Sequence, residues 1–365
     1  MKVNSIELNN FRNLSSVKIN AEPGVNVIYG ENAQGKTNIL EGIWLFTGLR
    51  SFRNTKDCDL IKFNEQFSKL SLNFEDSLRE KKCEIIIADK KKNISLNGVP
   101  IKSTGELVGN FYAVIFSPDH LSLIKSGPSE RRKFLDTALC QLKPSYVQAL
   151  GCYKKALLQR NSLLKDIHLN SQLYDILDTY DEQLAKYSAY IIKERIKYLK
   201  ILSQYSKEIY SGISENKEDI NIEYSFTANI DKKLSLEDIY NIQKQRIKEA
   251  KKEDVLQKTT SIGPHRDDID IFINNVSARS FGSQGQQRSC ALALKLGESE
   301  IIKNVTGETP VALLDDVMSE LDEKRQNYVL NHIKDRQVFM TCCDPSQVLR
   351  LWEGKSFLIK GGELI

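Results

Sequence analysis

The chain has 365 residues, of which 41% are hydrophobic and 27% charged, a composition typical of a globular protein large enough for two or three domains. Its 52 Lys and Arg against 48 Asp and Glu give a net charge of +4, which is compatible with nucleic-acid binding without indicating it. No apolar run is long enough to cross a bilayer, and the first residues lack the apolar core of a signal peptide, so we expect a cytoplasmic protein with no membrane partner.

The first 115 residues are rich in predicted strands. Apolar and polar residues alternate over 3–8 and 70–74, and the apolar run at 25–29 indicates a buried strand. Residues 94–101 contain Asn97-Gly98 between two short apolar runs, which predicts a hairpin. Residues 39–46 have the spacing of a helix.

A phosphate-binding loop lies between the strand at 25–29 and the helix at 39–46. Its sequence fits the pattern GxxxxGK[ST] and consists of Gly30, Glu31, Asn32, Ala33, Gln34, Gly35, Lys36 and Thr37. Backbone N–H groups and the start of the helix attract phosphate oxygens, and the glycines avoid a clash with them. We expect Lys36 to contact the β- and γ-phosphates of ATP and Thr37 to bind Mg²⁺. A glycine turn that only mimics this pattern lacks the strand and helix on either side.

From residue 126 the sequence becomes helical and basic. Helical spacing predicts helices at about 144–165, 173–210 and 236–258. Residues 125–210 contain 15 Lys or Arg and 9 Asp or Glu, a balance of +6. Two interpretations stay open: an ordinary solvated helical surface, or a DNA-binding face to which Arg131, Arg132 and Lys133 contribute.

Strand–helix alternation returns after about residue 260. Strands are predicted at 268–273, 311–314 and 338–342, and helices at 289–302 and 322–333. The sequence therefore predicts an α/β lobe assembled from residues 1–115 and 260–365, with residues 116–259 inserted as a mainly helical lobe.

Two further motifs belong to the returning α/β segment. Asp315 and Asp316 end the strand at 311–314, at the edge where α/β sheets bind ligands, so Asp315 is a candidate Mg²⁺ ligand and Asp316 a candidate for polarising the attacking water. Ser283, Gly285 and Gln286 lie at the start of a helix, where they form either another anion site or an ordinary serine N-cap. Most of the chain separates Lys36 from Asp315, so a large insertion must divide one nucleotide site.

Together these motifs resemble the ABC-type ATPase head of the SMC and RecF families, an α/β P-loop NTPase head with an inserted mainly helical lobe. The resemblance to the RecF family covers most of the chain, at 8–14 (LNNFRNL), 117–119 (SPD), 127–136 (GPSERRKFLD), 263–268 (GPHRDD) and 314–322 (LDDVMSELD). The inserted helices are too short for an SMC arm, since a helix of about 37 residues spans roughly 55 Å.

The resemblance implies a site shared by two copies of the chain. Residues 283–287 would be the signature motif that covers ATP held by the other copy, and 319–322 the D-loop, so ATP would promote a homodimer. Arg12 and Asn13 would approach the nucleotide. The family also implies DNA binding at single-strand gaps or junctions, a weak DNA-stimulated ATPase activity, and loading of RecA in recombinational repair and replication restart with RecO and RecR.

The sequence departs from transporter-type ABC enzymes at three points. Asp316 stands where those enzymes have Glu, Cys342-Cys343-Asp344 replaces the switch histidine, and no glutamine near 116–120 matches the Q-loop. These differences and the helical insertion disfavour a transporter ATPase subunit. Another SMC-like repair head, and a clamp that uses ATP only as a ligand, stay open as alternatives.

Overall fold

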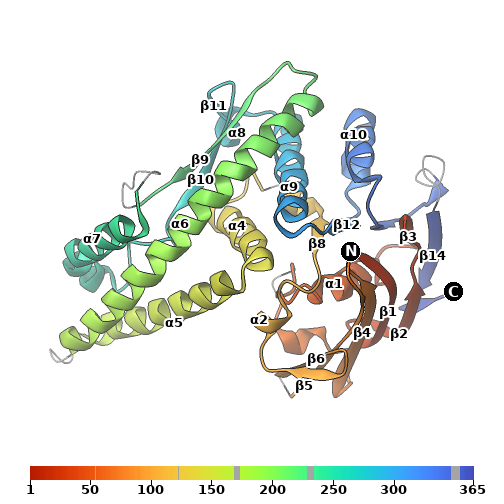
Figure 1. Cartoon of the computed structure of the whole chain (residues 1–365), viewed down its shortest axis with the longest axis horizontal. Coiled ribbons are helices and arrows are strands. Elements are labelled where there is room, and N and C mark those ends of the chain that lie inside the picture. Colours follow the sequence, from red (N-terminus) through yellow and green to blue (C-terminus); the bar gives the residue numbers. More distant parts are fainter. Residues whose placement is uncertain (54, 90, 122, 168–172, 228–233, 347–353) are drawn as a thin grey trace.

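The computed structural model describes the whole chain except residues 54, 90, 122, 168–172, 228–233 and 347–353, and it has two lobes lying side by side (Figure 1). One lobe contains both chain ends and two six-stranded sheets, and the other consists mainly of long helices. No helix in the described part of the chain is long and apolar enough to span a membrane.

A mainly parallel sheet forms the centre of the first lobe. In spatial order its strands are β15 (Glu363–Leu364), β14 (Gly354–Lys360), β3 (Val25–Tyr29), β13 (Val338–Cys342), β12 (Val311–Asp315) and β8 (Ala113–Phe116). Val311 and Leu313 join the hydrophobic core on one face, and Ala312 and Leu314 join the core on the other. Apolar layers on both faces explain why these strands read as continuous apolar runs.

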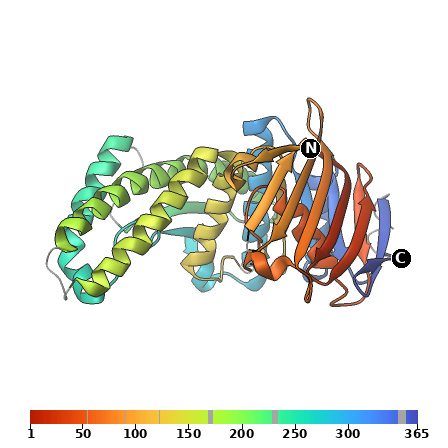
Figure 2. The ribbon, with the colours of Figure 1, turned by 90° about the horizontal axis from the view of Figure 1, so that it is seen from below.

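The second sheet of this lobe is antiparallel and forms an outer layer (Figure 2). Its strands, in spatial order, are β2 (Leu14–Asn20), β1 (Lys2–Phe11), β4 (Phe67–Glu75), β5 (Glu80–Ala88), β6 (Lys91–Leu96) and β7 (Val99–Ile101). Helix α1 (Lys36–Leu45) shares the core between the two sheets. A Cβ atom at Gly42 of α1 would come within 2.7 Å of the Leu8 side chain on β1, so a larger residue there would force Leu8 to move.

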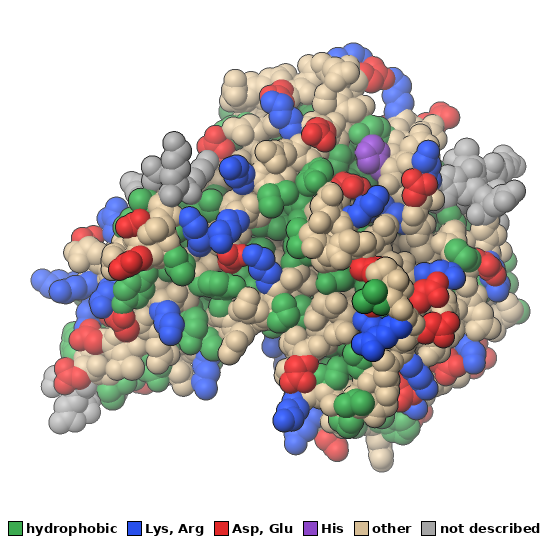
Figure 3. All heavy atoms as spheres, in the orientation of Figure 1, with side chains coloured by type: hydrophobic (Ala, Val, Ile, Leu, Met, Phe, Trp, Pro, Cys, Tyr) green, Lys and Arg blue, Asp and Glu red, His purple; other side chains and the backbone are tan. Residues whose placement is uncertain are grey.

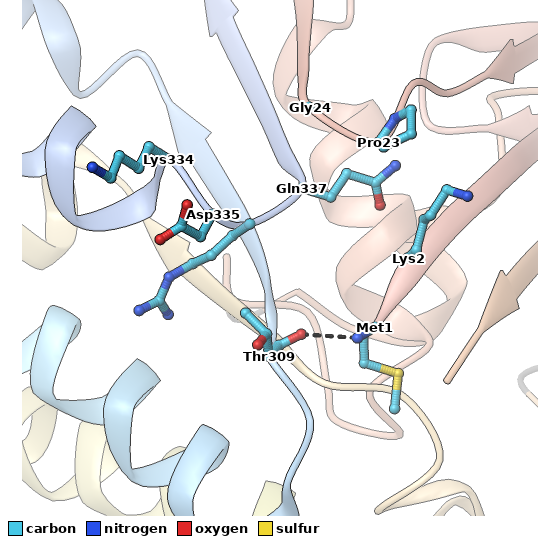
Figure 4. Close-up of a pocket in the computed structure, with 9 residues that line it drawn as sticks. Met1, Lys2, Pro23, Gly24, Thr309, Lys334, Asp335 and Gln337 are labelled. Atoms are coloured by element: carbon cyan, nitrogen blue, oxygen red, sulfur yellow. Dashed lines mark hydrogen bonds between the residues drawn. The ribbon is translucent and has the colours of Figure 1, made fainter. Parts of the chain in front are cut away.

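Gln337, just before β13, holds the two sheets together. Its side-chain oxygen accepts from the Val3 N–H at 2.6 Å, and its amide nitrogen donates to the carbonyls of Val3 and Glu22 at 2.8 and 2.7 Å. A pocket opens beside it, with the Met1 nitrogen 3.1 Å from the Thr309 carbonyl (Figure 4).

The second lobe is built on α4 (Pro128–Leu142), α5 (Pro144–Asp166), α6 (Leu173–Ile213) and α7 (Leu236–Gln257). Proline begins both α4 and α5, and Ser235 caps α7, so local sequence sets these starts. At 1.5 Å per residue the 41 residues of α6 span about 60 Å. The predicted helices at 144–165, 173–210 and 236–258 are confirmed to within a few residues.

A three-stranded sheet completes the second lobe. Its order is β11 (Val276–Ser277), β10 (Asp268–Ile273) and β9 (Ile220–Ser225). The strand at 268–273 was predicted correctly, but it pairs with β9 and not with the parallel sheet. Strand β9 was not predicted from the sequence, although Ile220, Ile222 and Tyr224 alternate with polar residues. The division of the chain at 116 and 260 stays a prediction.

The remaining elements are short helical segments and the two helices α9 and α10. They are η1 (Asp57–Leu60), α2 (Thr104–Leu107), α3 (Pro118–Leu121), α8 (Ala278–Phe281), α9 (Gln284–Thr306), η2 (Met318–Glu320) and α10 (Glu323–Ile333). Helix α9 packs along α6, where a Cβ atom at Gly297 would lie 3.1 Å from Leu202. The nucleotide-binding elements and the helical lobe therefore share one large core.

Candidate nucleotide site

The loop at residues 30–37 runs from the end of β3 to the start of α1. Gly30 has φ +151° and Gly35 has φ +112°, both in the region that favours glycine. A Cβ atom would collide with the carbonyl oxygen of Ile359 at Gly30, and would lie 2.7 Å from the Asn13 side-chain oxygen at Gly35. The backbone therefore turns tightly and aims the first N–H groups of α1 at the space in front of the sheet.

Lys36 is buried, with 8% of its surface exposed. Its Nζ donates to the carbonyls of Gly30 at 2.6 Å and Glu31 at 3.3 Å, and lies 3.4 Å from the Cys343 sulfur. Among the residues that the structure describes, no carboxylate forms an ion pair with this ammonium. A buried ammonium held only by neutral acceptors provides a strong site for an incoming anion.

Asp315 ends β12 at the carboxyl edge of the sheet, close to the loop. The hydroxyls of Thr37 and Thr341 both donate to its Oδ1, at 2.8 and 2.9 Å. Burial raises the pKa of Asp315 above its usual range, and the two hydroxyl hydrogen bonds act in the opposite direction. The structure thus brings Asp315 to the adjacent residues Lys36 and Thr37, although Thr37 and Asp315 lie 278 positions apart in the sequence.

Thr341 is a site residue that the sequence motifs did not reveal. It lies opposite Asp315 in the parallel pairing of β12 with β13, and its hydroxyl also accepts from the Asp316 N–H at 2.9 Å. Asp316 has φ +51°, so its backbone leaves the extended conformation of the strand at this residue. A polar residue within the apolar strand 338–342 was the available signal.

Other contacts fix the loop from outside. The Asn13 amide donates to the Ala33 carbonyl at 3.3 Å, and its oxygen accepts from Asn38 at 2.7 Å. The Gln34 side-chain oxygen accepts from the Gly361 N–H at 2.5 Å. These contacts place Asn13 against the loop, and its approach to a nucleotide stays a prediction.

Arg12 is held by the protein itself. Its guanidinium pairs with both oxygens of the buried Glu41, at 2.9 and 2.6 Å, and donates to Thr55 and to the Asp59 carbonyl. In this arrangement Arg12 fixes the second turn of α1 rather than offering a free charge. Its contact with a nucleotide stays a prediction.

The side chains present suit a magnesium ion that arrives with a nucleotide. Thr37 and Asp315 supply one hydroxyl and one carboxylate, and Mg²⁺ commonly combines one or two such oxygens with phosphate oxygens and water. The described residues contain no cluster of three or more His, Cys, Asp or Glu side chains that could hold a metal by itself.

The predicted signature segment begins α9, and Ser283 is its N-cap. The Ser283 Oγ accepts from the Gln286 N–H at 3.2 Å, and the Gln286 side chain accepts from the Ser283 N–H at 2.8 Å. Arg325 of α10 donates to the Gly285 carbonyl at 3.1 Å. The cap interpretation is thus confirmed, and Ser283 is also exposed. In Figure 1 α9 begins beside α8, whereas the phosphate loop precedes α1 in the other lobe.

The three basic residues proposed for DNA are used within the protein, which corrects the prediction for Arg131. Arg131 is 3% exposed and forms a bidentate ion pair with Asp268 at 2.8 and 2.7 Å. Arg132 donates to the Asp267 carbonyl at 2.7 Å, and Lys133 donates to the Phe52 carbonyl at 3.1 Å. Burial lowers the pKa of both Arg132 and Lys133. Only these two keep exposed surface.

The face of the molecule in Figure 3 carries no single basic patch. Lys and Arg side chains alternate with Asp and Glu over the helical lobe in this view. The pocket beside Met1 also lies away from the loop. Gly24, Thr309 and Gln337, which line it, precede β3, β12 and β13, so it opens at the amino edge of the sheet (Figure 4).

Comparison with known proteins gives consistent results along the whole chain. The family model of the RecF/RecN/SMC N-terminal domain matches residues 2–351. The DNA replication and repair protein RecF of Acetivibrio thermocellus is 42% identical over 358 residues, which cover 98% of this chain and 96% of that protein. The protein of the same name from Clostridium botulinum type A is 42% identical over 371 residues, covering 100% and 99%.

Solved structures agree with the sequence matches. A structure of the recombination mediator protein RecF-ATPrS in the RecFOR pathway superposes with a TM-score of 0.93 at 41% identity, covering 99% of this chain and 97% of that one. The Smc head domain of Pyrococcus furiosus superposes with a TM-score of 0.55 at 17% identity, which supports the ABC/SMC-type fold alone.

Proposed function

This chain belongs to the RecF family, and we propose that it is an ATPase of DNA replication and repair in which ATP closes two copies of the chain on DNA. One observation carries the proposal: Thr37 and Thr341 converge on Asp315, beside a buried Lys36 that has no carboxylate partner among the described residues. This is the arrangement expected for binding the phosphates and the metal of ATP.

We assign a role to each residue of the proposed site, and the loop geometry supports these roles. N–H groups of residues 30–37 and the start of α1 bind the phosphates, and Lys36 leaves the Gly30 carbonyl to contact the β- and γ-phosphates. Thr37 and Asp315 would hold Mg²⁺, which would neutralise charge on the phosphate oxygens. Asp316 orients the attacking water, while Thr341 fixes the backbone of Asp316. A carboxylate one methylene shorter than glutamate fits slow hydrolysis.

A second copy of the chain completes the site. Ser283 is exposed at the start of α9, and Gly285 and Gln286 form the first turn with it, so this end can approach a nucleotide held by the partner copy. ATP then bridges two chains, and hydrolysis releases them. Asn13 supports the loop within its own copy.

We infer the DNA and protein partners of this chain from its family. Relatives are named DNA replication and repair proteins, and a similar structure belongs to the RecFOR pathway. We propose binding at single-strand gaps or junctions, DNA stimulation of a weak ATPase activity, and cooperation with RecR and RecO in loading RecA. Half-buried Arg132 and Lys133 remain DNA-contact candidates, whereas Arg131 does not.

The test measures ATP-dependent dimerisation by light scattering. Lys36→Arg should weaken both ATP binding and dimerisation, because a planar guanidinium does not fit the Lys36 pocket. Ser283→Arg should leave ATP binding intact and weaken the dimer by at least about tenfold, because it blocks the shared site.

Ser235→Arg is a matched control, because Ser235 caps α7 with the same geometry as Ser283 caps α9. It loses a helix cap without touching the proposed interface and should dimerise normally. Full dimerisation of Ser283→Arg with ATP would refute the shared site. Binding of gapped, single-stranded and duplex DNA at several salt concentrations, with and without ATP, tests the DNA part.

A further inference from the structure

The thiol of Cys343 lies against the phosphate loop at residues 30–37. It directly follows β13, which lies between β3 and β12, so it emerges between the loop and Asp315. Its sulfur is 3.4 Å from the Lys36 ammonium and donates to the Asn32 side-chain oxygen at 3.3 Å. Both partners belong to residues 30–37. The backbone of this segment therefore holds the thiol where phosphate oxygens would meet Lys36.

Accessibility distinguishes Cys343 from most other cysteines. Cys83, Cys140 and Cys290 are buried, and burial raises the pKa of each of these thiols to about 12, which keeps them unreactive. Cys343 and Cys58 are exposed. Of these two, Cys343 contacts the loop, and Cys58 lies in η1 beside Asp59.

The Lys36 contact gives oxidation of Cys343 a defined consequence. Lys36 is buried and has only two carbonyls and this sulfur as hydrogen-bond partners among the described residues. A sulfinate at Cys343 is an anion, and its oxygens would reach the ammonium at charge-assisted hydrogen-bond distance. An oxidised Cys343 would thus occupy Lys36 in place of the γ-phosphate.

We propose that Cys343 is an oxidation site, and that its oxidised side chain competes with ATP for Lys36. The thiol sulfur donates an electron pair to hydrogen peroxide, takes one oxygen to become the sulfenic acid Cys343–SOH, and the other oxygen leaves as water. A second peroxide gives the sulfinate, a proton and another water. Two external thiols reduce the sulfenic acid back to Cys343–SH, forming one disulfide between them and one water.

ATP should protect the thiol. Bound phosphates occupy the space in front of Lys36 and Asn32, so the nucleotide covers the sulfur that is exposed in the empty loop. The inference rests on the proposed ATP site, and reactivity of Cys343 in the nucleotide-free protein can be measured separately from ATP binding.

The experiment uses the full-length protein and two serine variants, Cys343→Ser and the matched control Cys58→Ser. Mass spectrometry follows alkylation of each cysteine by iodoacetamide with and without Mg-ATP. We expect ATP to slow alkylation of Cys343 by about tenfold or more, as expected for a covered thiol, and to leave Cys58 unchanged. ATP affinity is then compared before and after brief peroxide treatment, relative to each untreated variant.

Peroxide should weaken ATP binding about tenfold in the unmodified protein and in Cys58→Ser, because one charge-assisted contact of Lys36 is lost. Dithiothreitol added afterwards should restore only the fraction that stopped at the sulfenic acid, because thiols do not reduce the sulfinate. Cys343→Ser should change by less than about twofold, within the variation of a lost weak contact. Equal peroxide sensitivity of Cys343→Ser, or alkylation of Cys343 that ATP does not slow, would overturn the proposal. Failure of the untreated protein to bind ATP would instead refute the proposed function.

Discussion

At the scale of single residues, the nucleotide site holds two charges in unfavourable surroundings. Burial raises the pKa of Asp315, so its ionised form is disfavoured, and the Lys36 ammonium lies among neutral acceptors. In the proposed site, Mg²⁺ would favour the carboxylate and phosphate would favour the ammonium. Binding of Mg-ATP would therefore stabilise both charges at once, which gives a physical reason for the proposed site to respond to ATP.

Two adjacent arginines of α4 are expected to have different roles: Arg131 stabilises the fold, and Arg132 contacts DNA. Arg131→Gln should destabilise the protein by about 3 kcal/mol, because it leaves the partly buried Asp268 without its ion-pair partner. Arg132→Gln should change stability little and reduce the slope of DNA affinity against salt by about one, as for the loss of one phosphate contact. Thermal melts and DNA titrations at several salt concentrations measure the two effects.

An unchanged salt slope in Arg132→Gln would remove Arg132 from the DNA contacts. A melting temperature of Arg131→Gln equal to that of the unmodified protein would contradict the structural role of the Arg131–Asp268 pair. The adjacent positions make each variant the control for the other.

At the scale of elements, the segment 263–268 between α7 and β10 anchors the helical lobe. The Pro264 carbonyl accepts from Arg195 of α6 at 2.7 Å, and His265 meets Tyr153 of α5 at 2.5 Å. Asp267 accepts from Tyr224 of β9 at 2.8 Å. Burial lowers the pKa of His265 to about 4, so this histidine is neutral near pH 7. One short segment thus joins α5, α6 and β9.

Gly263 is the position in this segment where a side chain cannot fit. It has φ +135°, and a Cβ atom would collide with the Tyr153 hydroxyl. Gly263→Ala should therefore cost about 2–3 kcal/mol of stability, measured by denaturant unfolding.

Gly151 provides the matched control, because it lies exposed within α5 and a Cβ atom there would project into open space. Gly151→Ala should be neutral or stabilise by up to about 1 kcal/mol, because alanine favours helix. A Gly263→Ala variant as stable as Gly151→Ala would show that small movements relieve the collision at Gly263.

At the scale of the whole molecule, the nucleotide site and the helical lobe share one core. Helix α9 follows its N-cap Ser283, packs along α6 and leads to β12, which ends in Asp315. A partner copy that contacts Ser283 would therefore act on a helix that leads directly to the strand with the proposed metal ligand. Dimer closure and the position of the helical lobe are expected to change together.

Dimer lifetime with Asp316→Asn separates an ATPase cycle from a clamp that uses ATP only as a ligand. Asparagine tolerates the φ of +51° at this position and keeps the N–H that donates to Thr341, so the local fold should survive. If hydrolysis opens the dimer, the variant should lengthen the ATP-dependent lifetime at least about tenfold, since a lost catalytic base typically costs about 10²–10⁴ in rate. Single-molecule dissociation on DNA measures this lifetime. An unchanged lifetime would show that turnover does not drive release.

The local features of the fold and of the site can be predicted from neighbouring residues. The loop at 30–37, the acidic end of β12 and the Ser283 cap each depend on neighbouring residues, and so do the starts of the helices at Pro128, Pro144 and Ser235. Glycine conformations, helix caps and apolar periodicity act over a few residues, so they can be identified from the sequence.

Contacts between segments that are distant in the sequence appear only in the folded structure. Thr341 reaches Asp315 only because β13 pairs with β12, and Cys343 reaches Lys36 only because β13 also pairs with β3. The strand at 268–273 was predicted, but its partner strand β9 was not. Arg131 was a candidate for DNA contact in the sequence, whereas the structure pairs it with Asp268. Strand pairing and the burial of charge depend on contacts between residues far apart in the chain, which no local pattern specifies.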